Sequence, residues 1–267
     1  MTDPRICLVT GASSGIGRAV AHELAGRGAA LVLMARRADV LEDVATECRI
    51  RGAASVTVAP VDVTDDEAVA ATVAATVAEH GRLDVVVNSA GLVTYGDHLE
   101  TSAADFRTVI EVNLLGAATV ARHTLPVLRE QREGTLVLVG SLLGHVAIPG
   151  MTAYVVSKWG VRALARQLKI ECADLPGVRV AYVAPGSVET PIYERALGDA
   201  SANGHRPPPP TMSPERAAQA VVRHVDGRRH EMQTAFSNHA VIAAFDVVPA
   251  VYDRVVGPAF RLLSRRG

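Results

Sequence analysis

The sequence predicts a doubly wound α/β fold, in which about seven strands form a parallel sheet with helices on both faces. The main observation is an alternation of short β-branched runs with longer, Ala-rich periodic segments, up to about Val183. Such alternation is typical of βαβ units. Runs such as Val85-Val86-Val87 also lack polar residues at alternate positions, as expected of strands buried on both faces. The third observation is a glycine-rich turn directly after the first strand.

The expected elements follow this alternation in order. Strands are expected in the short β-branched runs at Ile6–Thr10, Ala30–Met34, Ser55–Pro60, Asp84–Asn88, Thr135–Gly140 and Val178–Val183. Helices are expected in the periodic segments Ile16–Arg27, Ala38–Arg51, Asp65–His80, Ser102–Arg129 and Thr152–Ala173. Farther on, Ser213-Pro214-Glu215 begins a helix, because Ser is a favourable N-cap and Pro suits the first helical position. A short strand is expected around Glu231–Phe236.

The chain is expected to contain one α/β domain over residues 1–236 and a helical extension over residues 237–267. Residues 191–213 are rich in Gly, Ala, Asn and Pro, and a loop of this length in a compact domain is usually functional or disordered. We interpret it as a substrate lid. The polyproline run Pro207–Pro210 alternatively forms a stiff spacer or a ligand for a partner.

The C-terminal extension is expected to form one or two amphipathic helices, broken near Pro249 and Pro258. Its apolar stripe consists of Val247, Val248, Val251, Val255 and Phe260. This stripe fits a helix that packs on the body of the protein or on another subunit. Peripheral membrane contact is the less favoured alternative, because Asp246 and Asp253 interrupt the face.

Composition excludes several functional classes. The chain has 27 Lys+Arg and 28 Asp+Glu, so its formal net charge is −1, which argues against a nucleic-acid partner. Cys7, Cys48 and Cys172 are far apart and show no metal-ligand spacing, so no metal site is expected. These cysteines suit a reducing cytoplasm, and the N-terminus lacks the pattern of a signal peptide. The uncharged stretch Gly134–Ser157 contains Gly and Pro and is not expected to span a membrane.

The glycine-rich turn has the spacing Gly-x3-Gly-x-Gly and lies between the first strand and the first helix. Glycines allow the backbone to approach a pyrophosphate closely, and the helix N-terminus supplies N–H donors. An ordinary strand–helix turn is the alternative. The residues predicted to bind the cofactor here are Gly11, Ser13, Ser14, Gly15, Ile16 and Gly17.

The end of the second strand indicates which dinucleotide binds. An NAD site usually places Asp or Glu there, about 20 residues after the glycines. This sequence instead reads Ala35-Arg36-Arg37, and Arg pairs well with a 2′-phosphate. NADP(H) is therefore the favoured cofactor. NAD(H) is the alternative, because Arg36 and Arg37 are also compatible with two solvated arginines at the start of a helix that do not contact the cofactor.

Tyr154 and Lys158 are four residues apart and share one face of an expected helix. A phenol has an ordinary pKa of about 10, too high for efficient proton transfer at neutral pH. A neighbouring ammonium favours the phenolate and lowers that pKa. The pair thus suits acid–base catalysis, with a surface pair as the alternative.

Several motifs now occur together in the order and spacing of one family, and the chain resembles the short-chain dehydrogenases/reductases, whose fold is of the Rossmann type. The resemblance covers about Arg5 to Pro191. The motifs that carry it are Thr10–Gly17, Asp62-Val63, Asn88-Ser89-Ala90-Gly91, Asn113, Ser141, Tyr154 with Lys158, Pro185-Gly186 and Thr190-Pro191.

The resemblance implies four catalytic residues. Tyr154 would be the general acid in carbonyl reduction and the general base in alcohol oxidation. Lys158 would hydrogen-bond the nicotinamide ribose and lower the pKa of Tyr154. Ser141 would donate to the substrate oxygen, and Asn113 would hold a water molecule that connects Lys158 to solvent.

The resemblance also implies further cofactor contacts, beyond those of the glycine turn. The positions are Asp62, Val63, Asn88, Ala90, Gly91, Pro185, Gly186, Val188 and Thr190, together with Tyr154 and Lys158. Two positions depart from the family pattern. Ser89 replaces a more usual Asn, and Ser14 stands where some NADP-dependent members carry a basic residue, which leaves the NADP preference to Arg36 and Arg37.

Three further residues have two interpretations each. His145 lies between Ser141 and Tyr154, and we favour an exposed loop histidine over a pocket residue. Met151 and Tyr193 either line the substrate pocket or fill the core.

The expected function is interconversion of a carbonyl and a secondary alcohol on a small, hydrophobic ketone or alcohol, with a homodimer or homotetramer as the assembly. One alternative is a dinucleotide-binding sensor or scaffold without turnover. Others are an NAD-dependent dehydrogenase of the same family and an epimerase or dehydratase using the same Tyr–Lys pair.

Overall fold

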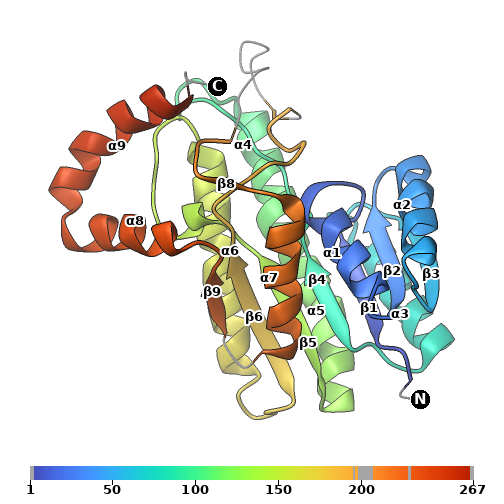
Figure 1. Ribbon diagram of the computed structural model, residues 1–267. Helices are drawn as coiled ribbons and strands as arrows, with labels where there is room; N and C mark the ends of the chain where they lie inside the picture. Colours follow the sequence, from blue (N-terminus) through green and yellow to red (C-terminus); the bar gives the residue numbers. More distant parts are fainter. Residues whose placement is uncertain (1–2, 195, 198–206, 228–229, 265–267) are drawn as a thin grey trace.

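A computed structural model describes residues 3–194, 196–197, 207–227 and 230–264, the last four of them in backbone only (Figure 1). Within these ranges, seven parallel strands form one sheet in the order β3-β2-β1-β4-β5-β6-β9. The strands are β1 (Ile6–Thr10), β2 (Ala30–Ala35), β3 (Ser55–Pro60), β4 (Val85–Asn88), β5 (Gly134–Val139), β6 (Val178–Ala184) and β9 (Glu231–Gln233). A separate parallel pair joins β7 (Ser187–Val188) to β8 (Thr211–Met212). The predicted doubly wound parallel sheet is confirmed.

Helices cover both faces of the sheet. Those on one face are α1 (Gly15–Ala25), α2 (Ala38–Ile50) and α7 (Pro214–Asp226), with α1 and α7 in front of the sheet in Figure 1. Those on the other face are α3 (Asp66–His80), α5 (Gly116–Gln131) and α6 (Thr152–Glu171). Ser213 caps α7 as predicted, since its hydroxyl accepts a hydrogen bond from the Arg216 N–H.

The central strands β1, β2 and β4 are almost entirely apolar because each side of the sheet has its own core. Along β1, Ile6 and Leu8 enter the core under α3, α5 and α6, while Cys7 and Val9 enter the core under α1, α2 and α7. Because successive side chains of a strand point to opposite faces, a strand between two cores needs apolar residues at consecutive positions.

The strand order reverses at β1, which lies between β2 and β4. The chain proceeds outward from β1 to β3 and then returns to the other side of β1 to form β4. Parallel α/β sheets bind ligands outside the carboxyl ends of the strands at such a point. These ends are Thr10 in β1 and Asn88 in β4.

Two helix predictions need correction. The segment Ser102–Arg129 is not one helix, because a π-helical turn, Glu111–Leu115, separates α4 (Ala103–Ile110) from α5. The extension contains two helices, α8 (Phe236–Val247) and α9 (Pro249–Ser264), but Pro258 lies inside α9 and does not break it. Much of the predicted lid, 191–213, lies outside the described residues.

The C-terminal helices are attached through aromatic residues rather than through their valine stripe. The Phe245 ring lies 6.0 Å from Trp159 of α6 and 5.1 Å from Tyr252, centre to centre. The Tyr252 hydroxyl donates to the Ala147 carbonyl at 2.8 Å. Val247, by contrast, is 76% exposed. None of the helices in the described ranges is long and apolar enough to cross a bilayer.

Candidate active site

A cavity of about 370 Å³ opens at the carboxyl ends of the strands, where the strand order reverses. Many of the residues predicted to bind the cofactor line it. They are Gly11, Ser13, Ser14, Gly15, Ile16, Arg36, Arg37, Asp62, Val63, Ala90, Gly91, Tyr154, Lys158 and Thr190. Residues from the segments after β1, β2, β3, β4 and β7 therefore meet residues of α6 around one space.

The glycine turn is compact because the chain passes very close to itself. Gly11 has φ +64°, and a Cβ there would lie 2.8 Å from the Ala90 nitrogen. A Cβ on Gly17 would overlap the carbonyl group of Gly11. Only glycine fits both positions. The turn directs the N-terminus of α1 at the cavity, where free N–H groups and the helix dipole favour an anion such as a diphosphate.

Thr10 joins the ends of β1 and β4. Its hydroxyl donates to the Asn88 side-chain oxygen at 2.8 Å and accepts from the Ser89 and Ala90 N–H groups, both at 3.1 Å. All the hydrogen-bonding capacity of this hydroxyl is used inside the protein. Asn88 thus supports the wall of the cavity from behind. Thr10 holds the ends of the two strands together, a role that its place in the sequence does not indicate.

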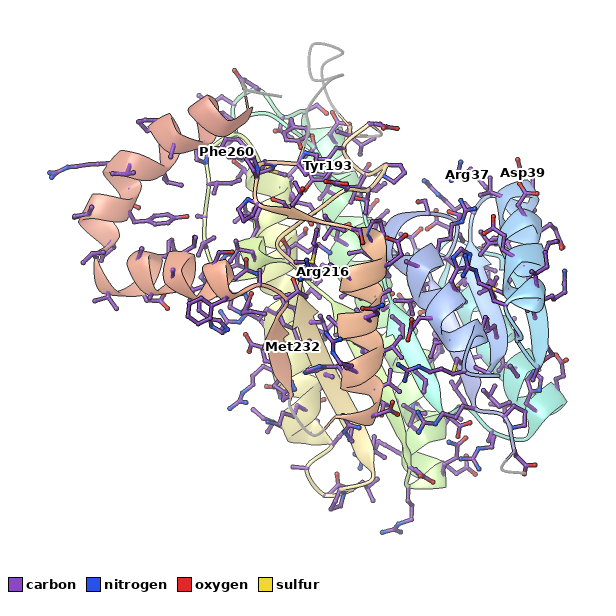
Figure 2. The ribbon with its side chains drawn as sticks, viewed as in Figure 1. Arg37, Asp39, Tyr193, Arg216, Met232 and Phe260 are labelled. Carbon is purple, nitrogen blue, oxygen red and sulfur yellow. The ribbon has the colours of Figure 1, made fainter. Side chains whose placement is uncertain are left out.

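One end of the cavity carries two guanidinium groups. The Arg37 side chain lies near the glycine turn, 3.5 Å from the Ser13 hydroxyl, and Figure 2 shows it beside α2. Arg36 is 3.8 Å from the Asp62 carboxylate. The other Asp62 oxygen accepts from the Thr64 N–H and hydroxyl groups, at 3.0 and 2.8 Å. This end can therefore hold a further anionic group.

Asn113 is buried in the π-helical turn and fastens the β4–α4 connection to α6. Its amide accepts from the Leu92 N–H at 2.7 Å and donates to the Leu92 carbonyl and the Ser157 hydroxyl, both at 2.9 Å. A π-helical turn inserts one residue into a helix and often marks a functional position. The Asn113 oxygen and Lys158 Nζ both lie against Gly91, so the side chain borders the lysine as well.

Tyr154 and Lys158 lie on the same face of α6, with Lys158 Nζ 5.5 Å from the centre of the Tyr154 ring. Nζ donates to the Val139 carbonyl at 3.3 Å. Burial lowers the pKa of Lys158 to about 8, because the ammonium is taken out of water. Burial likewise raises the pKa of Tyr154 to about 12, and a hydrogen bond with Ser141 partly opposes this rise.

Ser141 lies two residues after the end of β5 and caps a short 3-10 turn, Leu142–Gly144. Its side-chain oxygen accepts from the Leu143 N–H at 3.1 Å. Since that bond uses an oxygen lone pair, the hydroxyl hydrogen remains available to a second group. Ser141 is close enough to Tyr154 to lower the pKa of its phenol.

Beyond Tyr154 the site becomes apolar. Val93, Met151 and Val155 are buried there, and Tyr95, Leu143, Ile148, Tyr154, Ile192, Ala196 and Phe260 pack against them. Burial raises the pKa of Tyr95 and of Tyr193. Figure 2 shows Tyr193 and Phe260 on the same side of the molecule, where α9 reaches this cluster. Met151, one of the residues with two interpretations, thus fills a small core that borders the catalytic residues.

The other predicted residues lie around the cavity rather than on its surface. Gly17, Asn88 and Asn113 support it from behind, as described above. Ser141, Pro185, Gly186 and Val188 are outside its lining. The Pro185 carbonyl accepts from the Leu142 N–H at 2.7 Å, which connects this segment to the turn after Ser141.

The prediction for His145 was wrong. This residue is only 3% exposed, and its ring packs against Tyr182 of β6. Its Nε2 pairs with Glu231, which lies in β9. No local pattern around His145 indicates either contact, because both partners belong to distant strands.

The residues present fit a nicotinamide dinucleotide. The cavity combines an anion-binding turn, a cationic end at Arg36 and Arg37, and an apolar end that contains the partly buried Tyr154 and the buried Lys158. Its charged lining residues are Arg36, Arg37, Lys158 and Asp62, a balance that suits a diphosphate. Fold and site together define an oxidoreductase of the nicotinamide-dinucleotide class.

Comparison with known proteins agrees with this class. The chain belongs to the short-chain dehydrogenase/reductase family: the family model described as short chain dehydrogenase matches residues 5–199. Dehydrogenase/reductase SDR family member 7 from Homo sapiens is 37% identical over 192 residues, which are 71% of this chain and 57% of that protein. The chain therefore spans little more than half the length of this relative. Cis-4-hydroxycyclohexanecarboxylate dehydrogenase from Sinomonas cyclohexanicum is 38% identical over 220 residues, 81% of this chain and 87% of that enzyme.

Solved structures of the family have the same fold. An alcohol dehydrogenase from the archaeon Thermococcus sibiricus, complexed with 5-hydroxy-NADP, has a TM-score of 0.75 and 33% identity, covering 86% of this chain and 96% of that chain. A short-chain dehydrogenase/reductase from Burkholderia phymatum in complex with NAD has a TM-score of 0.81 and 25% identity, covering 90% and 92%. The family and the geometry of the site agree on a nicotinamide dinucleotide as the class of cofactor.

Proposed function

We propose that the protein is an NADP(H)-dependent oxidoreductase that interconverts a carbonyl group and a secondary alcohol on a small hydrophobic substrate. The observation that carries this proposal is the arrangement of Tyr154, Ser141 and Lys158. Ser141 lowers the pKa of the Tyr154 phenol, and Lys158 lies on the same helix face as Tyr154. Tyr154 and Lys158 line a cavity that has an anion-binding turn at one end and apolar side chains at the other, and Ser141 lies behind that lining.

Each residue has a specific role in this proposal. The bound nicotinamide supplies or accepts the hydride, and the protein supplies position and proton transfer. The Tyr154 phenol donates its proton to the carbonyl oxygen during reduction and accepts a proton from the alcohol during oxidation. The Ser141 hydroxyl donates a hydrogen bond to the same oxygen and stabilises its developing charge. The Lys158 ammonium binds the cofactor ribose and holds positive charge near the phenol.

The protonation state of Tyr154 favours reduction as the direction. Its pKa of about 12 keeps the phenol protonated at neutral pH, which is the form that a carbonyl reduction requires. Oxidation needs the phenolate, and burial disfavours that form unless the Lys158 ammonium compensates.

The choice of NADP(H) rests on the two arginines at the end of β2. Arg36 and Arg37 extend from the strand end where an NAD site usually has a carboxylate. Their guanidinium groups reach Asp62 on one side and Ser13 on the other, so a 2′-phosphate bound between them would accept charge-assisted hydrogen bonds. We expect Arg36→Ala/Arg37→Ala to weaken NADPH binding by at least tenfold and NADH binding by less than twofold, measured by fluorescence titration.

The apolar end supports a hydrophobic substrate, and a relative suggests a starting set of compounds. The Sinomonas cyclohexanicum relative is named for a cyclohexane alcohol with a carboxylate group. Apolar and aromatic side chains form the described cluster around Met151, so we propose uncharged cyclic ketones as better substrates than their carboxylated analogues.

The test is NADPH oxidation with a panel of cyclic ketones, comparing the wild type with Tyr154→Phe and Tyr252→Phe. We expect Tyr154→Phe to lose at least a thousandfold in kcat while its dissociation constant for NADPH changes by less than threefold. Tyr252→Phe removes a hydroxyl that bonds Ala147 outside the cavity and should keep wild-type turnover. A Tyr154→Phe enzyme with wild-type kcat would refute the mechanism.

We also propose that the chain forms a homodimer or homotetramer. Large apolar side chains are exposed around the π-helical turn and on α6, among them Leu115 at 53% and Val156 at 46%. Apolar side chains in such positions suit a contact between copies. Sedimentation should detect the oligomer, and Leu115→Lys/Val156→Lys should shift it toward the monomer.

A further inference from the structure

Tyr182 is a fully buried residue of β6 whose hydroxyl contacts the backbone of Ser141. The Tyr182 side chain is 1% exposed. Its hydroxyl accepts from the Ser141 N–H at 3.3 Å and donates to the Ser141 carbonyl at 3.2 Å. Both backbone polar groups of Ser141 thus bond to the same phenol. The proposed mechanism assigns no role to this residue.

The space for this phenol exists because two neighbouring residues are glycines. A Cβ on Gly140, directly before Ser141, would overlap the end of the Tyr182 ring. A Cβ on Gly144, at the end of the 3-10 turn, would overlap the Tyr182 hydroxyl and lie 2.8 Å from the Lys158 carbonyl oxygen. The turn that carries Ser141 therefore closes tightly around the phenol and against α6.

A second layer holds the Tyr182 ring. In the sheet, Tyr182 pairs with Glu231 of β9, so the two side chains point to the same face. The His145 ring lies 5.7 Å from the Tyr182 ring, centre to centre, and His145 Nε2 pairs with Glu231. The Gln233 side-chain nitrogen lies 3.1 Å from the same imidazole nitrogen, and Arg162 Nε lies 3.4 Å from the Glu231 carboxylate.

We propose that Tyr182 is a positioning residue for Ser141, supported from behind by His145 and Glu231. The phenol fixes the Ser141 backbone, and Leu143 fixes the orientation of the Ser141 hydroxyl, so that its hydrogen points at the substrate oxygen beside Tyr154. This inference rests on the proposed function, in which Ser141 donates to that oxygen.

The chemistry of Tyr182 suits this task. Burial raises its pKa well above the ordinary value, so the phenol stays neutral and can donate and accept at once. It is rigid, since a Tyr side chain has only two rotatable bonds and the ring is enclosed. A displacement of about 1 Å at a reacting group costs roughly 100-fold in rate, so a partial loss of restraint should have a measurable effect on kcat.

The first test is Tyr182→Phe, which keeps the ring and removes only the hydroxyl. We expect kcat for ketone reduction to fall about tenfold, while the dissociation constant for NADPH and the KM for the ketone change by less than twofold. Tyr252→Phe is the matched control, because it removes a buried tyrosine hydroxyl that also donates to a backbone carbonyl. Its kcat should stay within twofold of the wild type.

A double-mutant cycle separates positioning from a general effect on folding. If Tyr182 acts through the Ser141 hydroxyl, Tyr182→Phe should cost less than twofold when Ser141→Ala is already present. The same tenfold loss in both backgrounds would overturn the positioning role while leaving the proposed function intact. A wild type that binds NADPH but reduces no ketone would overturn the proposed function, and the positioning role with it.

Discussion

Removal of the Asn113 side-chain amide should destabilise the protein measurably, because this buried group connects two segments of the site. Asn113→Ala removes hydrogen bonds to the Leu92 N–H, the Leu92 carbonyl and the Ser157 hydroxyl, with lengths of 2.7 to 2.9 Å. At about 1 kcal/mol net for each bond, the expected loss in the free energy of unfolding is about 3 kcal/mol. For a chain of this size that corresponds to a decrease in Tm of roughly 6–12 °C.

The assay is urea unfolding followed by circular dichroism, with Asn238→Ala as the control. Asn238 is also buried, but its amide makes two longer bonds, to the Ala184 carbonyl at 3.4 Å and the Gln233 side chain at 3.1 Å. With two bonds instead of three, its replacement should cost at most about 2 kcal/mol. Equal losses for the two variants, or a loss below 1 kcal/mol for Asn113→Ala, would show that this amide does not hold the site together.

Three further predictions follow from the geometry of the site. Lys158 has a pKa of about 8, so its ammonium group loses its proton as the pH rises. NADPH affinity should therefore fall above pH 8. Lys158→Met should bind NADPH more weakly than the wild type and without this pH dependence. Gly17→Ala should abolish NADPH binding or folding, because the new Cβ would overlap the carbonyl group of Gly11. Gly26→Ala is the control: its Cβ would have no neighbouring atom closer than 3.6 Å, so Tm should change little in thermal melts. Phe260→Ala should lower the KM for larger cyclic ketones several-fold in steady-state assays while leaving the KM for NADPH unchanged.

The main strands and the glycine turn could be predicted because their signals are local. The apolar run of β1, followed at once by the glycines, determines both the buried strand and the helix that begins at Gly15. The alternation of elements then determines a parallel sheet. The change in strand order at β1 places Thr10 and Asn88 side by side, although 78 positions separate them in the chain.

Other features could not be predicted because their partners are distant or their signals are weak. His145 looked like an exposed loop residue, but its partner Glu231 is 86 positions away. Tyr182 belongs to an ordinary apolar run, and only the folded chain brings its hydroxyl to Ser141. The π-helical turn at Asn113 adds a single residue to the helical period, which leaves the apolar pattern almost unchanged.

The most direct test of the proposed hydride transfer is to follow an isotope from the cofactor to the product. NADPH carrying deuterium at the transferable position of the nicotinamide is incubated with the protein and a cyclic ketone, and the alcohol is analysed by mass spectrometry. Hydride transfer with Tyr154 as the proton donor predicts one deuterium on the carbinol carbon with the wild type. It predicts no labelled alcohol with Tyr154→Phe despite unchanged NADPH binding. Tight NADPH binding by the wild type without labelled product from any ketone, or labelled product from Tyr154→Phe at the wild-type rate, would contradict it.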